Sequence, residues 1–372
     1  MNEPYKLLIV DDSRLMRKAI RRIFADDDRI EVVGEAANGG AALEIIPQID
    51  PDVVTMEVNM PVMDGLTTLK HMMIETPKPT VMLNTLTLEG TSVMFDALRF
   101  GAVDFVPKPS KLDESKLKGQ EETVVRKVAL AAQVEIEAIR YIRVFPKFES
   151  VEPNGQVACN RLIAMGASEG GYGAYLKIVP RLRPESPAAY LAVLYAASQH
   201  VDAFARYLDN YSSVRVKRAV DGLPLEGGVF YLGAGAEYVT VQSRNSDLFL
   251  QVRPAPFKSI SEREGSINML MFSTAEVMGH RAVGIVLSGS GHDGAEGLAE
   301  IIRTGGTAVV QEPKSCLYKE MALSALVRNT PEYINLISDT KIASAANNFF
   351  NVDDNHNRGN KPPAVGGKTH VK

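Results

Sequence analysis

The chain is poor in the residues that mark several protein classes. It has no tryptophan and only two cysteines, Cys159 and Cys316, among 372 residues. These two cysteines make no disulfide framework and lack the spacing of metal ligands, so we expect a reducing, cytoplasmic environment. No run of about 18 apolar residues is present, and the apolar stretch before Asp11 is too short for a signal peptide. We therefore expect no membrane insertion.

A strong excess of one charge is also missing. The sequence has 41 Lys and Arg residues against 45 Asp and Glu residues, which gives a net charge of -4. This balance gives no argument for binding to nucleic acid or to an anionic membrane surface. A helix-turn-helix pattern is also missing. We expect no nucleic-acid partner.

What the chain does have is a regular alternation of short apolar runs and helical patterns. Strand-like runs lie at residues 6–10, 30–33, 52–58, 80–83 and 103–106, and a second alternation runs from Arg161 to about Ala345. Alternating strands and helices predict parallel βαβ units, so we expect an α/β protein with two doubly wound parallel sheets. The predicted division is a first domain at 1–143, a linker at 144–156, a second domain at 157–345 and a disordered tail at 346–372.

Charged side chains follow the strands of the first domain. Asp11 and Asp12 come directly after a buried strand, Glu57 ends the third apolar run, and Lys108 follows the fifth. Sites in open parallel sheets form at the carboxyl ends of strands, so we expect these four side chains to converge. Three carboxylates beside one ammonium predict a pocket for a small hard cation such as Mg²⁺.

The motifs around these residues resemble a response-regulator receiver, which has a flavodoxin-like fold. They are IVDDSRLMRKAI, PDVVTMEVNMPVMDGL and GAVDFVPKP. The resemblance implies that Asp11 and Asp12 bind Mg²⁺, that Glu57 stands at the phosphoacceptor position, and that Lys108 and Asn84 stand at the phosphate-sensing positions. It also implies a histidine kinase as a partner. The family has Asp at the phosphoacceptor position, and Ser or Thr where this chain has Asn84.

The extra methylene of Glu57 moves its carboxylate further into the pocket. Phosphoryl transfer depends on positioning, so this displacement should slow it severely. Three interpretations stay open. The glutamate imitates the phosphorylated state in part, the receiver has lost its switch, or phosphorylation is slow but real.

The second domain begins with a candidate nucleophile. Ser168 lies in the glycine-rich stretch Met165–Gly171, between a predicted strand and a predicted helix. A serine at such a helix N-terminus meets unpaired N–H groups that favour a developing oxyanion. Glycine-rich turns of this kind also bind phosphates, so the motif needs a base and an acid beside it.

Histidines and aspartates near other strand ends supply those partners. His200 follows the apolar run 190–197, and both His292 and Asp293 follow the predicted strand 282–287. The simplest triad is Ser168 as nucleophile, His200 as base and Asp293 as the acid that orients it. His292 is the rival base, although the side chains of sequence neighbours such as His292 and Asp293 usually diverge.

The second domain resembles the catalytic domain of the protein-glutamate methylesterase CheB. The motifs GASEGG, SQH and GSGHDGAEGL carry the resemblance, and Ser168, His200 and Asp293 fall on the triad positions of that family. It implies hydrolysis of γ-glutamyl methyl esters, and deamidation of glutamines, on chemoreceptor helices, with no cofactor for hydrolysis. The cleft departs from the family at Gly289–Gly291, His200-Val201, Gly265–Asn268 and Leu232–Gly235. The alternatives are an altered or inactive relative that acts as an interaction module, and an esterase for another protein.

Overall fold

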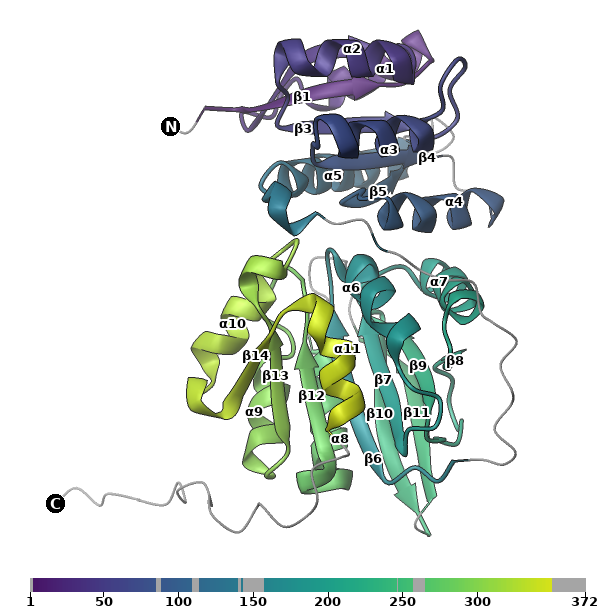
Figure 1. Cartoon of the computed structure of the whole chain (residues 1–372), viewed down its shortest axis with the longest axis vertical. Helices are drawn as coiled ribbons and strands as arrows, with labels where there is room; N and C mark the ends of the chain where they lie inside the picture. The colour runs from purple at the N-terminus through teal and green to yellow at the C-terminus, as the bar shows by residue number, and fades with distance from the viewer. Residues whose placement is uncertain are drawn as a thin grey trace, which may run out of the picture.

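The computed structural model describes residues 3–84, 88–108, 114–139, 142, 157–245, 247–256 and 265–349. Its first part is a five-stranded parallel sheet in the order β2-β1-β3-β4-β5 (Figure 1). The strands are β1 (Tyr5–Val10), β2 (Ile30–Ala36), β3 (Val53–Glu57), β4 (Thr80–Asn84) and β5 (Asp104–Pro107). This order is that of a flavodoxin-like doubly wound sheet, as predicted.

Helices cover both faces of this sheet, because alternate residues of each strand point to opposite sides. Leu7 and Ile9 share a buried cluster with residues of two helices of this domain, whereas Leu8 and Val10 share another with residues of three helices of this domain and with residues of the second domain. The first face carries α1 (Arg14–Ile23) and α5 (Glu114–Ala131), and the second carries α2 (Gly39–Ile49), α3 (Gly65–Glu75) and α4 (Leu88–Arg99). Ser13 caps α1 by accepting from the amide of Met16.

The second part is a seven-stranded parallel sheet in the order β14-β13-β12-β6-β7-β9-β8. Its strands are β6 (Arg161–Ala167), β7 (Ala188–Leu194), β8 (Arg215–Arg218), β9 (Val229–Ala234), β12 (Ala282–Val286), β13 (Thr307–Gln311) and β14 (Ile334–Ile337). An antiparallel pair, β10 (Glu237–Arg244) and β11 (Asp247–Pro254), lies outside this sheet. Two parallel-sheet α/β domains were predicted, and both are confirmed.

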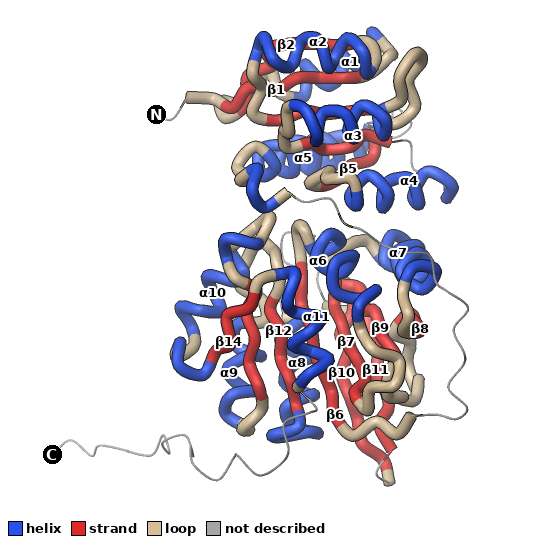
Figure 2. The backbone as a smooth tube through the Cα atoms, in the orientation of Figure 1, coloured by secondary structure: helices blue, strands red, loops and turns tan. Residues whose placement is uncertain are grey.

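The same alternation places the helices of the second sheet. Ile163 and Met165 of β6 join the cluster with α6 (Gly171–Ile178), α7 (Ser198–Tyr211) and α11 (Asp339–Asn348). Leu162 and Ala164 join the cluster with α8 (Ser266–Met278), α9 (Ala295–Arg303) and α10 (Glu320–Arg328). Tube and ribbon views show the strand-end loops of this sheet facing the first domain (Figure 2).

The structure differs from the predicted domain boundaries at the carboxyl-terminal end of the second domain. Helix α11 continues to Asn348, and Ala346 is fully buried, so ordered structure extends past the predicted end at residue 345. The reason is that Ala343 and Ala346 keep the helical spacing of the apolar face. The predicted linker, residues 144–156, and most of the predicted tail lie outside the described residues. No helix in the described part of the chain is both long and apolar enough to cross a membrane.

An aromatic cluster joins the two domains. It contains Phe95 of α4, Phe105 of β5, Tyr172 of α6, and Phe204 and Tyr207 of α7. The ring centroids of Phe95 and Phe204 are 4.9 Å apart, and those of Phe105 and Tyr172 are 5.2 Å apart. The Tyr207 hydroxyl donates to Asp96 at 2.6 Å. Because these rings are buried, the two domains share one hydrophobic core.

Candidate active site

The turn between β6 and α6 carries Ser168. The turn is closed by Gly170, whose φ of 76° lies in the left-handed region that favours glycine. The Ser168 side chain is buried, and its hydroxyl donates to the carbonyl oxygen of Ser290 at 3.0 Å. The Sδ atom of Met321 lies 3.3 Å from the same hydroxyl. Ser168 therefore has the predicted strand–turn–helix setting, with its hydroxyl held against the loop after β12.

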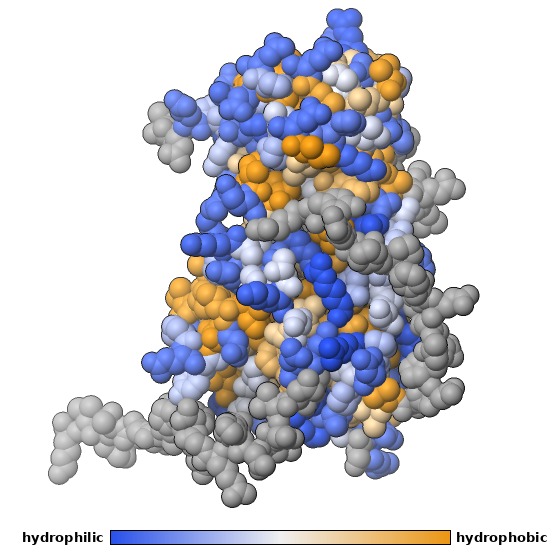
Figure 3. Space-filling view, in the orientation of Figure 1, coloured by the Kyte–Doolittle hydropathy of each residue, from blue (hydrophilic) through white to orange (hydrophobic). Residues whose placement is uncertain are grey.

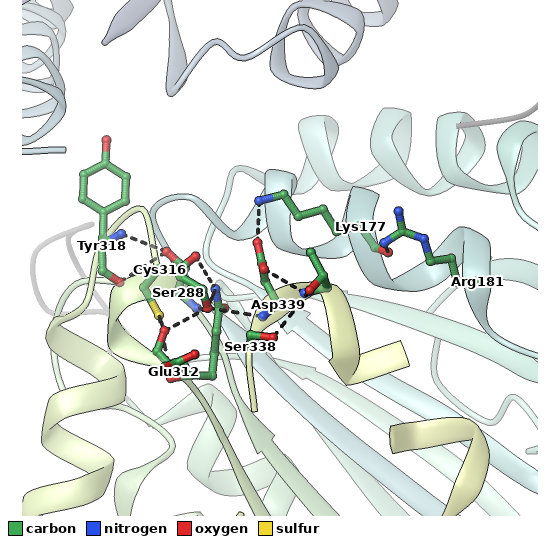
Figure 4. Close-up of polar contacts among 11 residues, drawn as sticks. Lys177, Arg181, Ser288, Glu312, Cys316, Tyr318, Ser338 and Asp339 are labelled. Carbon is green, nitrogen blue, oxygen red and sulfur yellow. Dashed lines mark hydrogen bonds and ion pairs between the residues drawn. The ribbon is translucent and has the colours of Figure 1, made fainter. Parts of the chain in front are cut away.

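That loop approaches Ser168 closely because residue 289 is a glycine. A Cβ atom on Gly289 would lie 2.4 Å from Ser168 Oγ and 2.1 Å from Met321 Sδ, so no larger residue fits without a shift. The neighbouring Ser288 hydroxyl accepts from the amide of Tyr318 at 3.0 Å and donates to the carbonyl of Glu169 at 3.2 Å. The close-up shows Ser288 joined to Tyr318 in this way, beside the 2.6 Å ion pair between Lys177 of α6 and Asp339 of α11 (Figure 4). These contacts fix the turn that holds Ser168.

Asp293 lies in the loop that follows the neighbouring strand, β12, and is buried. Its Oδ2 atom accepts from the Tyr195 hydroxyl at 2.6 Å and from the amide of Ile267 at 2.8 Å. Its Oδ1 atom accepts from the amides of Asn268 at 3.0 Å and Gly294 at 2.9 Å. The carboxylate is therefore bonded to the first turn of α8 and to one phenol, an arrangement that suits an anion at a helix N-terminus.

His200 lies beyond the carboxyl end of β7, on the side where the sequence placed it. The strand β7 ends at Leu194 and α7 begins at Ser198, so His200 is in the first turn of the helix that follows β7. The strand end was misplaced because Ala196 and Ala197 prolong the apolar run beyond the last paired residue. The imidazole packs against Phe105 of the first domain, with ring centroids 5.8 Å apart.

His200 is not hydrogen-bonded to Asp293 in this structure. Its Nε2 atom is buried and has no hydrogen-bond partner among the described residues, and the described donors to Asp293 do not include His200. Burial, and then the nearby ammonium of Lys127, lower the pKa of His200. The assignment of His200 as the base stays a prediction. The rival, His292, is exposed to solvent.

Tyr195 is the residue at this site that the sequence analysis missed. It directly follows β7, and its hydroxyl contacts the predicted acid, Asp293. Only His200 and His292 were predicted as candidate bases, and Tyr195 fell inside the predicted apolar run 190–197. A usable signal was present, because Tyr195 stands one residue after its strand just as Ser168 stands one residue after β6.

Glu169 connects the Ser168 turn to the first domain. One oxygen accepts from the Ser290 hydroxyl at 2.5 Å, and the other pairs with Arg126 of α5. Burial works in the opposite direction, but the bond from Ser290 and the charge of Arg126 lower the pKa of Glu169 to about 2. The guanidinium of α5 is thus held next to the candidate nucleophile by a carboxylate that stays ionised.

The pocket of the first domain brings together three of its predicted residues. Asp11 and Glu57 are buried, and the Lys108 ammonium pairs with both, at 2.8 Å from Asp11 Oδ2. Each carboxylate also accepts a hydrogen bond from a backbone amide. The Ser13 amide donates to Asp11 at 2.9 Å, and the Asn59 amide donates to Glu57 at 3.1 Å. Glu57 therefore reaches the lysine directly.

Asp12 and Asn84 are less involved in this pocket. Asp12 is exposed, and its carbonyl oxygen accepts from Arg17 at 3.3 Å. Asn84 ends β4, and its side chain lies outside the described part of the structure, as does Thr85. Within the described residues, no group of three or more His, Cys, Asp and Glu side chains is placed to hold a metal ion. Asp11 and Asp12 supply carboxylate oxygens, which are suitable ligands for Mg²⁺, but Asp11 is paired with Lys108 in this structure.

Comparison with known proteins decides the family. Residues 7–118 match the response regulator receiver domain, and residues 163–344 match CheB methylesterase. A Pyrococcus horikoshii protein named protein-glutamate methylesterase/protein-glutamine glutaminase is 34% identical over 339 residues, which are 90% of this chain and 91% of that protein. The chain belongs to the CheB methylesterase family. A CheB family member from Carboxydothermus hydrogenoformans, named protein-glutamate methylesterase/protein-glutamine glutaminase 2, is 33% identical over 87% of this chain and 93% of its own length.

A solved structure, the Thermotoga maritima CheB methylesterase catalytic domain, covers 52% of this chain and 100% of its own, with 21% identity and a TM-score of 0.48. Membership of the CheB family confirms the resemblance, the two kinds of domain and the hydrolase class predicted from the motifs. The first domain is accordingly called the receiver below, and the second the hydrolase domain.

Proposed function

We propose that this chain hydrolyses γ-glutamyl methyl esters, and glutamine amides, on the cytoplasmic helices of chemoreceptors. The observation that carries the proposal is the buried Ser168 hydroxyl in a strand–turn–helix, with the buried Asp293 in the loop after the neighbouring strand β12. The names of the relatives in the CheB family supply the substrate class. The reaction takes place in the cytoplasm, where the receptor helices lie.

In this reaction the Ser168 Oγ attacks the γ-carbonyl carbon and loses its proton to a base. The proton passes to the leaving group, methanol or ammonia departs, and water then releases glutamate from the serine ester. The N-terminus of α6 favours the oxyanion that develops at the carbonyl oxygen. The predicted base is His200, which would have to turn away from the receiver to act.

A groove beside Ser290 supports a helical substrate. It has a volume of about 630 Å³ and is lined by Leu130 of α5, Ser290, and Leu323 and Val327 of α10. Val327 is 88% exposed and Leu323 is 43% exposed. The surface over α10 and β14 is correspondingly hydrophobic (Figure 3). An amphipathic helix can place its apolar face in such a groove and present a glutamyl ester towards Ser168.

We further propose that the receiver binds a histidine kinase and that its pocket has lost rapid phosphoryl transfer. Asp11 and Asp12 would hold Mg²⁺, whose charge would stabilise incoming phosphoryl oxygens. Lys108 already pairs with both Asp11 and Glu57, so a metal ion would have to compete with that ammonium. Support for the domain's role comes from its match to the receiver family.

The proposal is tested by incubating the purified full chain with a methylated receptor fragment and measuring released methanol. Ser168→Ala should lower the release by about a thousandfold or more while leaving the melting temperature unchanged. His200→Ala and His292→Ala, compared in parallel, identify the base. Equal release by the natural protein and Ser168→Ala would contradict the nucleophile assignment.

A further inference from the structure

Glu169 directly follows the candidate nucleophile, and its carboxylate is held on both sides. One oxygen, Oε2, accepts from the Ser290 hydroxyl at 2.5 Å, and the carbonyl oxygen of the same Ser290 accepts from the Ser168 hydroxyl at 3.0 Å. The other oxygen, Oε1, pairs with the guanidinium of Arg126, and the Glu169 side chain is only 17% exposed. The carboxylate is therefore fixed directly beside the residue that would attack the substrate.

Glu169 brings a negative charge to this position. Burial opposes ionisation, but the bond from Ser290 and the charge of Arg126 outweigh it and lower the pKa of Glu169 to about 2. Among the described ion pairs, Arg126 is the one cation that contacts Glu169, and it comes from α5 of the receiver. A buried carboxylate that loses its cation is costly. Glu169 therefore favours any other cation that reaches it when Arg126 is displaced.

Helix α5 shows how a helix can approach this site. Arg126 places its guanidinium on Glu169, and Leu130, four residues later, lines the groove beside Ser290. Residues four apart lie on one face of a helix, with Cβ atoms about 5–6 Å apart. One face of α5 thus offers a cation to the carboxylate and an apolar side chain to the groove. A substrate helix that carries a glutamyl ester to Ser168 meets the same two features.

We propose that Glu169 sets substrate specificity by selecting a lysine or arginine one helical turn from the glutamyl ester, and that this side chain takes the place of Arg126. The inference rests on the proposed function, with Ser168 as nucleophile and a receptor helix as substrate. The cation and the ester must share one helix face, because Ser168 and Glu169 are neighbours in a single turn. An acidic side chain at the same position would meet a like charge, so such substrates are disfavoured.

The test uses the purified full chain and methylated receptor-helix peptides that differ at one position. Lysine, glutamine or glutamate stands four residues from the methyl ester, first on one side and then on the other. On one of the two sides, kcat/KM for methanol release should be at least about tenfold higher with lysine than with glutamate, mainly through KM. Glu169→Gln should reduce that ratio to below about threefold, whereas Glu332→Gln, at an exposed carboxylate of the same domain, should keep it. A ratio near one on both sides in the natural protein would overturn the proposal while leaving the proposed hydrolysis intact.

A charge swap separates specificity from folding. The double variant Glu169→Arg with Arg126→Glu keeps an ion pair between α5 and the turn, and the Ser290 hydroxyl can accept a hydrogen bond where it now donates one. The preference of this variant should reverse, so that the glutamate peptide is hydrolysed faster than the lysine peptide. Arg126→Ala alone should instead raise the preference for lysine, because the receiver no longer supplies a competing cation. An unreversed preference in the double variant would contradict the assignment of Glu169.

A second readout does not depend on the substrate class. Ser168 is labelled with two fluorophosphonates that differ only in their tail, one ending in a trimethylammonium group and the other in a carboxylate. The natural protein should be labelled at least about threefold faster by the cationic reagent, and the double variant by the anionic one. If labelling follows this pattern but no peptide releases methanol, the charge selection by Glu169 stands and the substrate class proposed above is wrong. Equal labelling by both reagents, in the natural protein and in Arg126→Ala, would overturn the proposal.

Discussion

The receiver pocket and the Ser168 site are both built at the carboxyl ends of parallel strands, but they hold their buried carboxylates by different means. In the receiver, Asp11 and Glu57 share one ammonium, that of Lys108, and each accepts one described backbone amide. In the hydrolase domain, Asp293 has no lysine or arginine partner among the described ion pairs. It accepts hydrogen bonds from three backbone amides and from one phenol. A carboxylate fixed by backbone amides is rigid, whereas one fixed by a lysine can be released when that side chain moves.

Removing Asp293 should have the largest effect. Asp293→Ala would leave the Tyr195 hydroxyl and the amides of Ile267 and Asn268 buried without an acceptor, so we expect a loss of about 3–5 kcal/mol in urea unfolding. The matched control is Asp221→Ala, since Asp221 is exposed and accepts one amide, from Val252, at 3.0 Å. The control should lose less than about 1 kcal/mol. Equal losses of unfolding free energy in the two variants would show that the hydrogen bonds to Asp293 do not stabilise the fold.

Removing Lys108 should have the next largest effect. Lys108→Met leaves two buried carboxylates without a cation, and we expect the receiver to lose about 2–4 kcal/mol. Adding Glu57→Gln should recover part of this loss, because one of the two charges is then removed. Lys78→Met is the control, since Lys78 pairs with the exposed Asp50, and its effect should be small. No recovery in the double variant would mean that Glu57 carries no charge in the pocket.

Shortening Glu57 should change the chemistry of the pocket more than its stability. A small-molecule phosphodonor with Mg²⁺ should not label the natural receiver, whereas Glu57→Asp should acquire Mg²⁺-dependent, base-labile labelling. The reason is that aspartate withdraws the carboxylate by one methylene towards an in-line position. Mass spectrometry of the labelled peptide locates the phosphoryl group. Robust labelling of Glu57 in the natural protein would show that the longer side chain still serves as an acceptor.

The contact between Glu169 and Arg126 should give the smallest effect. The pKa of Glu169 is lowered to about 2 in the folded protein, below its ordinary 4.5. The stabilisation is therefore complete above about pH 5 and is lost as the pH falls towards 2. Arg126 is 44% exposed, so solvent screening keeps the contribution below about 1 kcal/mol.

Arg126→Ala should accordingly speed Ser168 labelling by less than about fivefold, by loosening the receiver over the turn. It should also flatten the fall in stability between pH 5 and 2, measured by thermal unfolding at each pH. Arg14→Ala, an exposed arginine on α1, serves as the control. If Arg126→Ala loses stability between pH 5 and 2 just as the natural protein does, the ion pair of Glu169 with Arg126 does not contribute to the loss of stability in acid.

Much of the fold followed from the sequence because alternating apolar runs fix the strands directly. Predicted runs such as Thr80–Leu83 and Ala282–Leu287 differ from the observed strands by one residue at the carboxyl end. Ser168 and Asp293 were located by the same logic, since Ser168 directly follows one such run and Asp293 lies in the loop after another. The strand-end rule therefore works where the end of a strand is marked by polar residues or glycines.

The partner of Asp293 could not be found in this way. The apolar run of β7 continues through Ala196 and Ala197, so its end was placed at residue 197, and Tyr195 was taken for a strand residue. The contact of His200 with Phe105 depends on packing between two domains, which no local pattern encodes. Side chains whose roles depend on contacts between distant segments are the ones that pattern reading misses.

The aromatic cluster between the domains has a consequence for how the protein responds to temperature. Phe95 and Phe204 are fully buried, and Phe105, Tyr172 and Tyr207 are nearly so. Parting the domains would hydrate these rings, and the free-energy cost of hydrating apolar surface falls on cooling. The receiver is therefore held against the hydrolase domain most weakly in the cold, and warming towards physiological temperature strengthens the contact between the two domains.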